Sequence, residues 1–179
     1  MHNCVIWQNQ TDMTHTIISG TDRVGSNTLK VARQLRALLA DKGVDASLVS
    51  LEGLPLAGRS AALERLEEAY LVPATHFLFV VPEYNGSFPG SLKTVMDLSD
   101  IRRVWWGKKA MLTGVSTGRA GNLRGMEHLT GILNYLKVTV LPNRLPVSMV
   151  DRLMNAEGRI SDEATLAALS AQLDDFLRF

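Results

Sequence analysis

The hydrophobic pattern of the chain alternates between two periods from Thr14 onward. Short runs rich in apolar and β-branched residues, typical of strands, alternate with longer stretches in which apolar residues recur every three or four positions, as in amphipathic helices. Strands are predicted at residues 14–19, 44–51, 77–81 and 109–115, with a fifth within 138–150 that Pro142 and Pro146 interrupt. Helices are predicted at residues 29–39, 61–70, 89–99, 122–136 and 161–179.

Five strands alternating with five helices indicate βαβ units and a parallel sheet between two helical layers, an α/β three-layer sandwich. Right-handed crossovers leave few arrangements, and the commonest for a five-stranded parallel sheet is the order 2-1-3-4-5. Residues 77–81 (FLFVV) form an uninterrupted apolar run, typical of a central parallel strand covered on both faces. Ligands of such sheets bind beyond the carboxyl ends of the strands, so the loops after strands one, three and four are the expected site.

Length and composition fit one globular domain. The chain has 179 residues, of which 46% are apolar, and this allows a sizeable core. We expect a single domain over residues 14–179. The polar residues 1–13 precede the regular pattern and are expected to be a poorly ordered N-terminal extension.

Charge and cysteine content exclude several classes of protein. The chain carries 19 Lys and Arg against 18 Asp and Glu, so no basic excess favours nucleic acid or an anionic membrane. Cys4 is the only cysteine and the four histidines are scattered, so no disulfide within the chain and no metal centre are expected. Neither a signal peptide nor a membrane span is recognisable, and a cytoplasmic location is the expectation.

Loop 1 (residues 20–28, GTDRVGSNT) combines two glycines with hydroxyl, amide and guanidinium groups at the start of a helix. A helix start attracts anions, and Arg23 adds planar donors suited to phosphate, so the loop predicts a monophosphate socket. In the alternative interpretation Ser26 or Asn27 merely caps the helix, which ends near Gly43, and Arg23 is solvated. The loop matches neither G-x-G-x-x-G nor G-x-x-x-x-G-K-[ST], which disfavours a Rossmann dinucleotide or a P-loop nucleotide.

Two further loops follow predicted strands. Loop 2 (residues 82–90, PEYNGSFPG) could present backbone N–H groups beside the ring of Tyr84, an arrangement that suits a flat heterocycle. Loop 3 (residues 116–122, STGRAGN) is small and polar, and its glycines allow close backbone approach. Either loop taken alone is consistent with an ordinary turn, and the hypothesis depends on all three lying at one sheet edge.

Loops 1 and 2, together with Ser19 and with Leu92-Lys93, resemble the NAD(P)H-dependent FMN reductases, flavodoxin-like flavoproteins that include chromate, azo-dye and quinone reductases. The similarity covers residues 14–150, and P-E-Y-N after an apolar strand is its most specific marker. Thr94 stands where the family commonly has Asn, whereas Asp97 keeps the expected acidic residue. That helix usually contributes to a dimer contact in the family, so the resemblance implies a homodimer or homotetramer.

The resemblance also implies a cofactor and the residues that hold it. FMN would bind non-covalently, with its phosphate at Thr21, Arg23, Ser26, Asn27 and Thr28. The flavin ring would lie against Pro82, Glu83, Tyr84 and Asn85, and its other side would be closed by Ser116, Thr117 and Gly118. NAD(P)H would pass hydride to the flavin and leave before a small acceptor, such as free flavin, quinone, azo compound or metal oxyanion, takes its place. No catalytic base is nominated, because the cofactor does the difficult step.

Two other functions stay open, an FMN electron carrier without a productive nicotinamide site and a regulatory module that has lost the flavin.

Several residues have structural interpretations instead of functional ones. Trp105 and Trp106 are expected in a core or interface rather than in the substrate cleft, His76 to be partly buried and His128 to be solvated. For the basic cluster, a solvated face is favoured over a site for the NADPH phosphate; its members are Arg102, Arg103, Lys108 and Lys109. Three methionines are expected to fill the core: Met111, Met126 and Met149.

Overall fold

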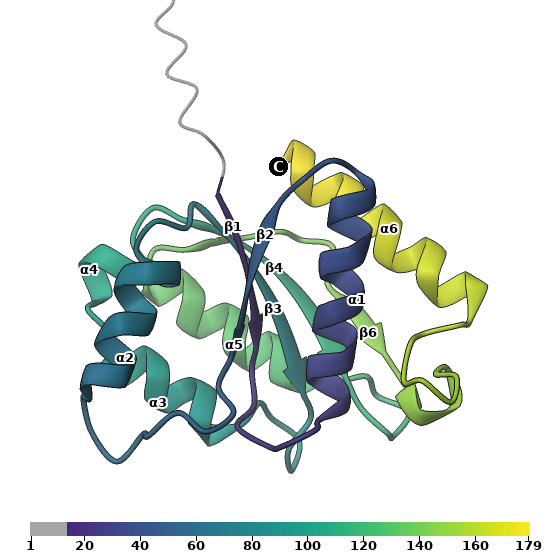
Figure 1. Ribbon diagram of the computed structural model, residues 1–179, viewed down its shortest axis with the longest axis horizontal. Helices are drawn as coiled ribbons and strands as arrows, with labels where there is room; N and C mark the ends of the chain where they lie inside the picture. Colours follow the sequence, from purple (N-terminus) through teal and green to yellow (C-terminus); the bar gives the residue numbers. More distant parts are fainter. Residues whose placement is uncertain (1–13) are drawn as a thin grey trace, which may run out of the picture.

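A parallel sheet runs through the middle of the computed structural model, which describes residues 14–179 (Figure 1). The expectations for residues 1–13, including Cys4, lie outside the described residues. The strands are β1 (His15–Ser19), β2 (Ala46–Ser50), β3 (His76–Pro82), β4 (Lys109–Val115), β5 (Thr139–Val140) and β6 (Leu145–Val147). Their order is β2-β1-β3-β4-β5, with β6 also paired to β4, and every pairing is parallel. The predicted order 2-1-3-4-5 is confirmed.

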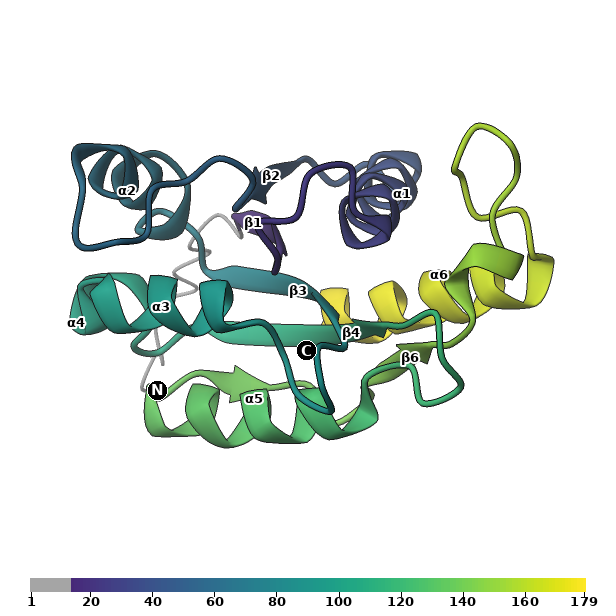
Figure 2. The same ribbon diagram turned by 90° about the horizontal axis from the view of Figure 1, so that it is seen from below.

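Helices cover both faces of the sheet, as the view from below shows (Figure 2). One face carries α1 (Asn27–Asp41) and α6 (Glu163–Arg178). The other carries α2 (Ala61–Leu66), α3 (Gly90–Leu98), α4 (Ile101–Val104) and α5 (Leu123–Tyr135). Strand β3 separates two buried clusters, because Phe77, Phe79 and Val81 face the second layer while Leu78 and Val80 face the first. The central position predicted for residues 77–81 is therefore confirmed.

The predicted fifth strand is two strands in the structure. β5 pairs with the beginning of β4, β6 pairs with its end, and Pro142 lies between them. Pro146 lies within β6 opposite Gly114, which an edge strand tolerates because one side needs no ladder N–H. The interruption predicted at these prolines thus divides the strand, and the sheet has six strands in the described residues.

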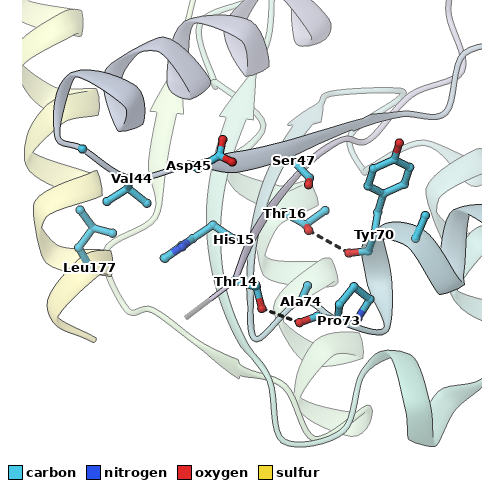
Figure 3. Close-up of a pocket in the computed structure, with 12 residues that line it drawn as sticks. Thr14, His15, Thr16, Val44, Asp45, Ser47, Tyr70, Pro73, Ala74 and Leu177 are labelled. Atoms are coloured by element: carbon cyan, nitrogen blue, oxygen red, sulfur yellow. Dashed lines mark hydrogen bonds between the residues drawn. The ribbon is translucent and has the colours of Figure 1, made fainter. Parts of the chain in front are cut away.

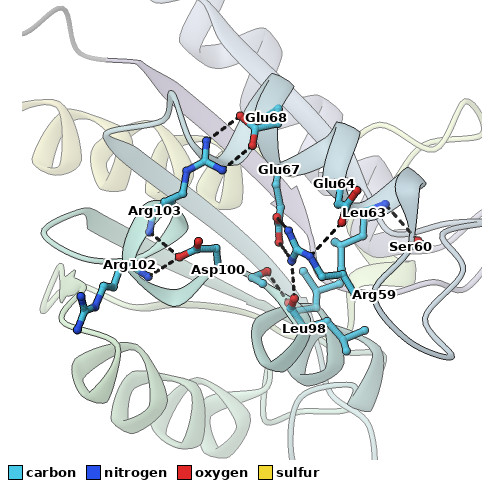
Figure 4. A network of polar contacts seen from close by, with 12 residues as sticks. Arg59, Ser60, Leu63, Glu64, Glu67, Glu68, Leu98, Asp100, Arg102 and Arg103 are labelled. Atoms are coloured by element: carbon cyan, nitrogen blue, oxygen red, sulfur yellow. Dashed lines mark hydrogen bonds and ion pairs between the residues drawn. The ribbon is translucent and has the colours of Figure 1, made fainter.

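Helix boundaries differ most from the prediction in two places. α2 is shorter than predicted and continues as a π-helical turn, η1 (Glu67–Leu71), and the four-residue α4 was not predicted. Arg59 connects the π-helical turn to the end of α3. Its guanidinium lies 2.7 Å from the buried carboxylate of Glu67 and donates to the carbonyl of Leu98 at 2.7 Å (Figure 4). Arg103 of α4 pairs with Glu68 at 2.7 Å. These ion pairs and the hydrogen bond to Leu98 join η1 to α3 and α4, away from the three loops.

The two tryptophans have different surroundings. Trp105 is fully buried and packs on Phe77 and Phe79, as expected of a core residue. Trp106 is 39% exposed, and the side chains of Lys137 and Arg102 lie over its ring. Neither tryptophan lines the cavity formed by the three loops.

The solvated basic face is wrong for Lys108. Its side chain is buried and donates to the carbonyls of Leu71 and Val72, and burial lowers the pKa of its ammonium to about 8. Lys109 donates to the carbonyl of Phe179. Both lysines lie where β4 begins, at the opposite end of the strand from loop 3. Met111 and Met126 are buried as expected, whereas Met149 is only partly buried and has a positive φ of 47°.

Two buried polar side chains contribute to the packing around α6. Gln172 accepts from the Thr113 hydroxyl at 2.8 Å and donates to the carbonyls of Leu112 and Asn143, each at 2.9 Å. His76 is buried more fully than predicted, and its Nδ1 lies 2.9 Å from the Thr75 hydroxyl. Burial, followed by the charges of His15 and Lys109, lowers the pKa of His76 to about 4.

Candidate functional site

Loops 1, 2 and 3 meet at the carboxyl edge of the sheet and enclose a cavity of about 120 Å³. Nine of the twelve predicted residues line it: Arg23, Ser26, Asn27, Thr28, Pro82, Glu83, Tyr84, Ser116 and Thr117. Val115 and Val150 also line the cavity and had not been singled out, because neither carries a chemical signal. Asn85, Gly118 and Thr21 do not line it, but Thr21 contacts two residues that do, Tyr84 and Arg23.

Tyr84 joins loops 1 and 2. Its hydroxyl lies 2.9 Å from the Thr21 hydroxyl, and the guanidinium carbon of Arg23 lies 4.9 Å from its ring centroid. The Thr21 hydroxyl also accepts from the backbone N–H of Arg23 at 3.3 Å. Residues some sixty positions apart are therefore held together, as the prediction of one site requires.

At the start of α1, backbone N–H groups are more available to an anion than the side chains of Ser26 and Asn27. Ser26 is the N-cap, because its hydroxyl accepts from the N–H of Leu29 at 3.1 Å, which supports the capping alternative for this side chain. The amide of Asn27 donates to Asp151 at 2.6 Å and accepts from Lys30 at 3.2 Å. The N–H groups of a first helical turn have no partner within the helix. Within residues 14–179 the hydroxyl of Thr28 and the charge of Arg23 are also unpaired.

Loop 2 contains a tight two-residue turn. Tyr84 and Ser87 exchange backbone hydrogen bonds of 2.8 and 3.0 Å, and the central residues Asn85 and Gly86 have φ values of 51° and 79°. Positive φ at both positions is the type I′ geometry that Asn-Gly favours. The N–H of Glu83 donates to the carbonyl of Val115 at 2.9 Å and ties the loop to β4. The turn therefore has a fixed position beside the cavity.

Asn122 positions loop 2 and was not predicted to do so. The residue is fully buried, and its amide donates to the carbonyls of Val81 and Pro82 at 3.0 and 2.9 Å. Glycines allow this approach, since a Cβ on Gly125 would lie 2.0 Å from the Asn122 oxygen and one on Gly114 would lie 2.1 Å from the carbonyl of Gly121. An asparagine after glycine at a helix start was the only signal in the sequence.

A larger cavity, of about 660 Å³, lies at the amino-terminal ends of β1 and β2 and borders Thr14, the first described residue (Figure 3). Its hydroxyl groups are partly used within the fold, because Thr16 donates to the carbonyl of Tyr70 at 2.9 Å. Ligands of parallel sheets bind at the opposite, carboxyl ends of the strands. The smaller cavity, where three loops converge with a free guanidinium, is therefore the candidate site.

Within residues 14–179, no three side chains of His, Cys, Asp or Glu are grouped so that they could hold a metal ion. No helix in the described part of the chain has the length and apolar character needed to cross a membrane.

Comparison with known proteins identifies the family. A family model described as NADPH-dependent FMN reductase matches residues 13–151, which include all three loops. The chain belongs to this family. An NAD(P)H-dependent FMN reductase of Pseudomonas aeruginosa is 32% identical over 166 residues, which are 87% of this chain and 89% of that protein. A quinone reductase of Escherichia coli is 31% identical and covers 89% of this chain and 91% of its own.

A further relative agrees with this reductase assignment, and solved structures show the fold. A 2-hydroxy-1,4-benzoquinone reductase of a Burkholderia species is 28% identical, with 89% of this chain and 92% of that protein covered. The NAD(P)H:acceptor oxidoreductase FerB of Paracoccus denitrificans superposes with a TM-score of 0.75 at 23% identity, covering 93% and 96% of the two chains. A short-chain flavodoxin superposes with a TM-score of 0.55 at 12% identity, covering 93% and 97%. These structural matches confirm the flavodoxin-like fold, and the family membership makes this chain an oxidoreductase.

Proposed function

We propose that this reductase holds FMN in the site formed by loops 1, 2 and 3 and transfers hydride from NAD(P)H to a small acceptor. The observation that carries the proposal is the contact of Arg23 and Thr21 with Tyr84, which joins the helix start to the P-E-Y-N turn. When bound, FMN supplies the hydride-accepting chemistry. NAD(P)H and the acceptor would then occupy the same space in turn, which is a ping-pong cycle.

The donor set at the start of α1 fits the FMN phosphate. Arg23 supplies an unpaired guanidinium, Thr28 a hydroxyl, and the first helical turn those backbone N–H groups that Ser26 does not cap, all of which favour an anion. The cavity volume of about 120 Å³ is below the roughly 300–1,000 Å³ of a pocket that encloses a whole ligand of this size. We infer that the cavity takes the phosphate end and that the flavin ring lies against loops 2 and 3.

Loop 2 would supply the backbone donors beside the ring. The N–H groups of Glu83 and Tyr84 are already bonded to the carbonyls of Val115 and Ser87, so they are not available. Within residues 14–179 the N–H groups of Asn85 and Gly86 have no acceptor. Because the type I′ turn fixes these two groups, they would stabilise negative charge on the reduced ring without reorganisation. No side chain is needed as an acid or base, and we nominate none.

A quinone is the acceptor we propose first, because relatives at 28% and 31% identity are named as benzoquinone and quinone reductases. We further propose a homodimer or homotetramer formed through α3, near which Ile101 and Tyr135 expose 43% and 84% of their surface. A cytoplasmic location is part of the same proposal.

Anaerobic titration separates this function from the alternatives. Purified protein saturated with FMN should lose its flavin colour when one equivalent of NADPH or NADH is added. Steady-state rates should then be measured against nicotinamide concentration at several fixed quinone concentrations. The double-reciprocal plots should give parallel lines. Reduction by dithionite but by neither nicotinamide would indicate an electron carrier, and failure to bind FMN would indicate a flavin-free module. Intersecting lines would contradict the ping-pong cycle alone.

A further inference from the structure

Two guanidinium groups flank the turn of loop 2. Arg23 lies over the ring of Tyr84 on the side of the cavity. On α5, Arg124 lies against Gly86, such that a Cβ built on this glycine would be 2.8 Å from the Arg124 Nη1. The positive φ of 79° favours glycine at position 86, and the end of the Arg124 side chain lies over this residue. The same turn therefore contacts a cation assigned to the FMN phosphate, through Tyr84, and a second cation with no role in that assignment, through Gly86.

The same face of α5 brings a second polar group to loop 2. His128 follows Arg124 by four positions, so the two side chains lie on one face of the helix. The Nδ1 atom of His128 lies 2.9 Å from the Ser87 hydroxyl. Arg124, His128 and Ser87 therefore form a polar rim (the α5 rim) that adjoins the P-E-Y-N turn.

The charge of the α5 rim is not neutralised within residues 14–179. Arg124 has no carboxylate partner there, whereas Glu127 on the same helix pairs with Arg144 at 2.7 Å. Both Arg124 and His128 are exposed. An exposed guanidinium beside the turn, without a carboxylate partner, is suited to a phosphate or another planar anion. The other basic group, around Lys108 and Lys109, lies at the opposite end of β4.

We propose that the α5 rim binds an anionic group on the molecule that exchanges hydride with the flavin. This inference rests on the proposed function and adds charge recognition to it. The anion has two possible sources, the 2′-phosphate of NADPH on the donor side and the ionised hydroxyl of a hydroxyquinone on the acceptor side. Arg124 is the residue that supplies the charge, and Gly86 and the Ser87–His128 contact keep the rim against the turn.

The experiment compares Arg124→Gln with the wild-type holoenzyme in steady-state kinetics. If the donor is recognised, the ratio of kcat/KM for NADPH to that for NADH should fall about 10- to 100-fold, as expected for a lost charge-assisted contact. If the acceptor is recognised, the ratio for 2-hydroxy-1,4-benzoquinone to unsubstituted 1,4-benzoquinone should fall instead. The loss should appear mainly in KM, and Arg124→Lys should restore part of it.

Arg33→Gln is the matched control, because Arg33 is an exposed arginine on α1 that does not line the cavity. This control should change neither ratio. If Arg124→Gln also changes neither ratio while FMN binding and turnover persist, the inference is overturned and the proposed function stands. If the wild-type protein binds no FMN or neither nicotinamide reduces it, both are overturned.

Discussion

Replacing Arg23 with alanine tests the phosphate socket. The guanidinium lies 4.9 Å from the Tyr84 ring centroid, lines the cavity and has no carboxylate partner among the described residues. Its hydrogen bond to an FMN phosphate would be charge-assisted, and such a bond contributes about 1.5–3 kcal/mol. Solvent screening lowers this value, while the N–H groups at the start of α1 and Thr28 remain as donors. We therefore expect a loss of about 1–3 kcal/mol in binding free energy, or about 5- to 150-fold in Kd.

The assay is a titration of apoprotein with FMN, followed by the change in flavin fluorescence at a fixed salt concentration. Riboflavin, which lacks the phosphate, serves as a second ligand, and Arg33→Ala serves as the control variant. Arg23→Ala should weaken FMN but leave riboflavin within about twofold of the wild type, since less than 0.5 kcal/mol should be lost. Unchanged FMN affinity would refute the socket. Equal weakening of both ligands would show that Arg23 acts on the shape of loop 1 and not on the phosphate.

Three further predictions concern stability, each measured by urea unfolding. Gln172→Leu should lose about 2–4 kcal/mol, because two carbonyls and a hydroxyl would remain buried without their partner; a loss below about 1 kcal/mol would contradict this. Trp105→Ala should cost about 3–5 kcal/mol and Trp106→Ala at most about 1.5 kcal/mol, since only the first ring is fully buried; equal losses would be inconsistent with this packing. The pKa of His76 is lowered to about 4, so its contribution is complete above the usual pKa of 6.5 and is lost as the pH falls toward 4. The wild-type protein should lose about 1–3 kcal/mol over this interval, and an equally steep loss in His76→Gln would exclude His76 as its cause.

The arrangement of the sheet was predictable because its determinants are local. Burial on both faces leaves an uninterrupted apolar run in residues 77–81, and right-handed connections then restrict the order of the strands. The convergence of the three loops follows from that order. The division of the last strand was only partly predictable, since Pro142 and Pro146 mark an interruption but do not show that both halves pair with β4.

Side-chain partners were less predictable, because they depend on residues that are distant in the sequence. Lys108 resembles its exposed neighbours in the sequence, yet the carbonyls of Leu71 and Val72 hold it inside. Asn122 gave almost no signal, although it fixes the end of β3. The side chain of Ser26 caps α1, so the amino acid type alone did not distinguish a phosphate ligand from a cap.

A crystal structure of the protein with FMN bound would test the central claim most directly. We predict that the phosphate lies at the start of α1 in the cavity lined by Arg23 and Thr28, with the flavin ring against Tyr84. Flavin bound in the larger cavity beside Thr14, or bound with its phosphate away from loop 1, would contradict the account.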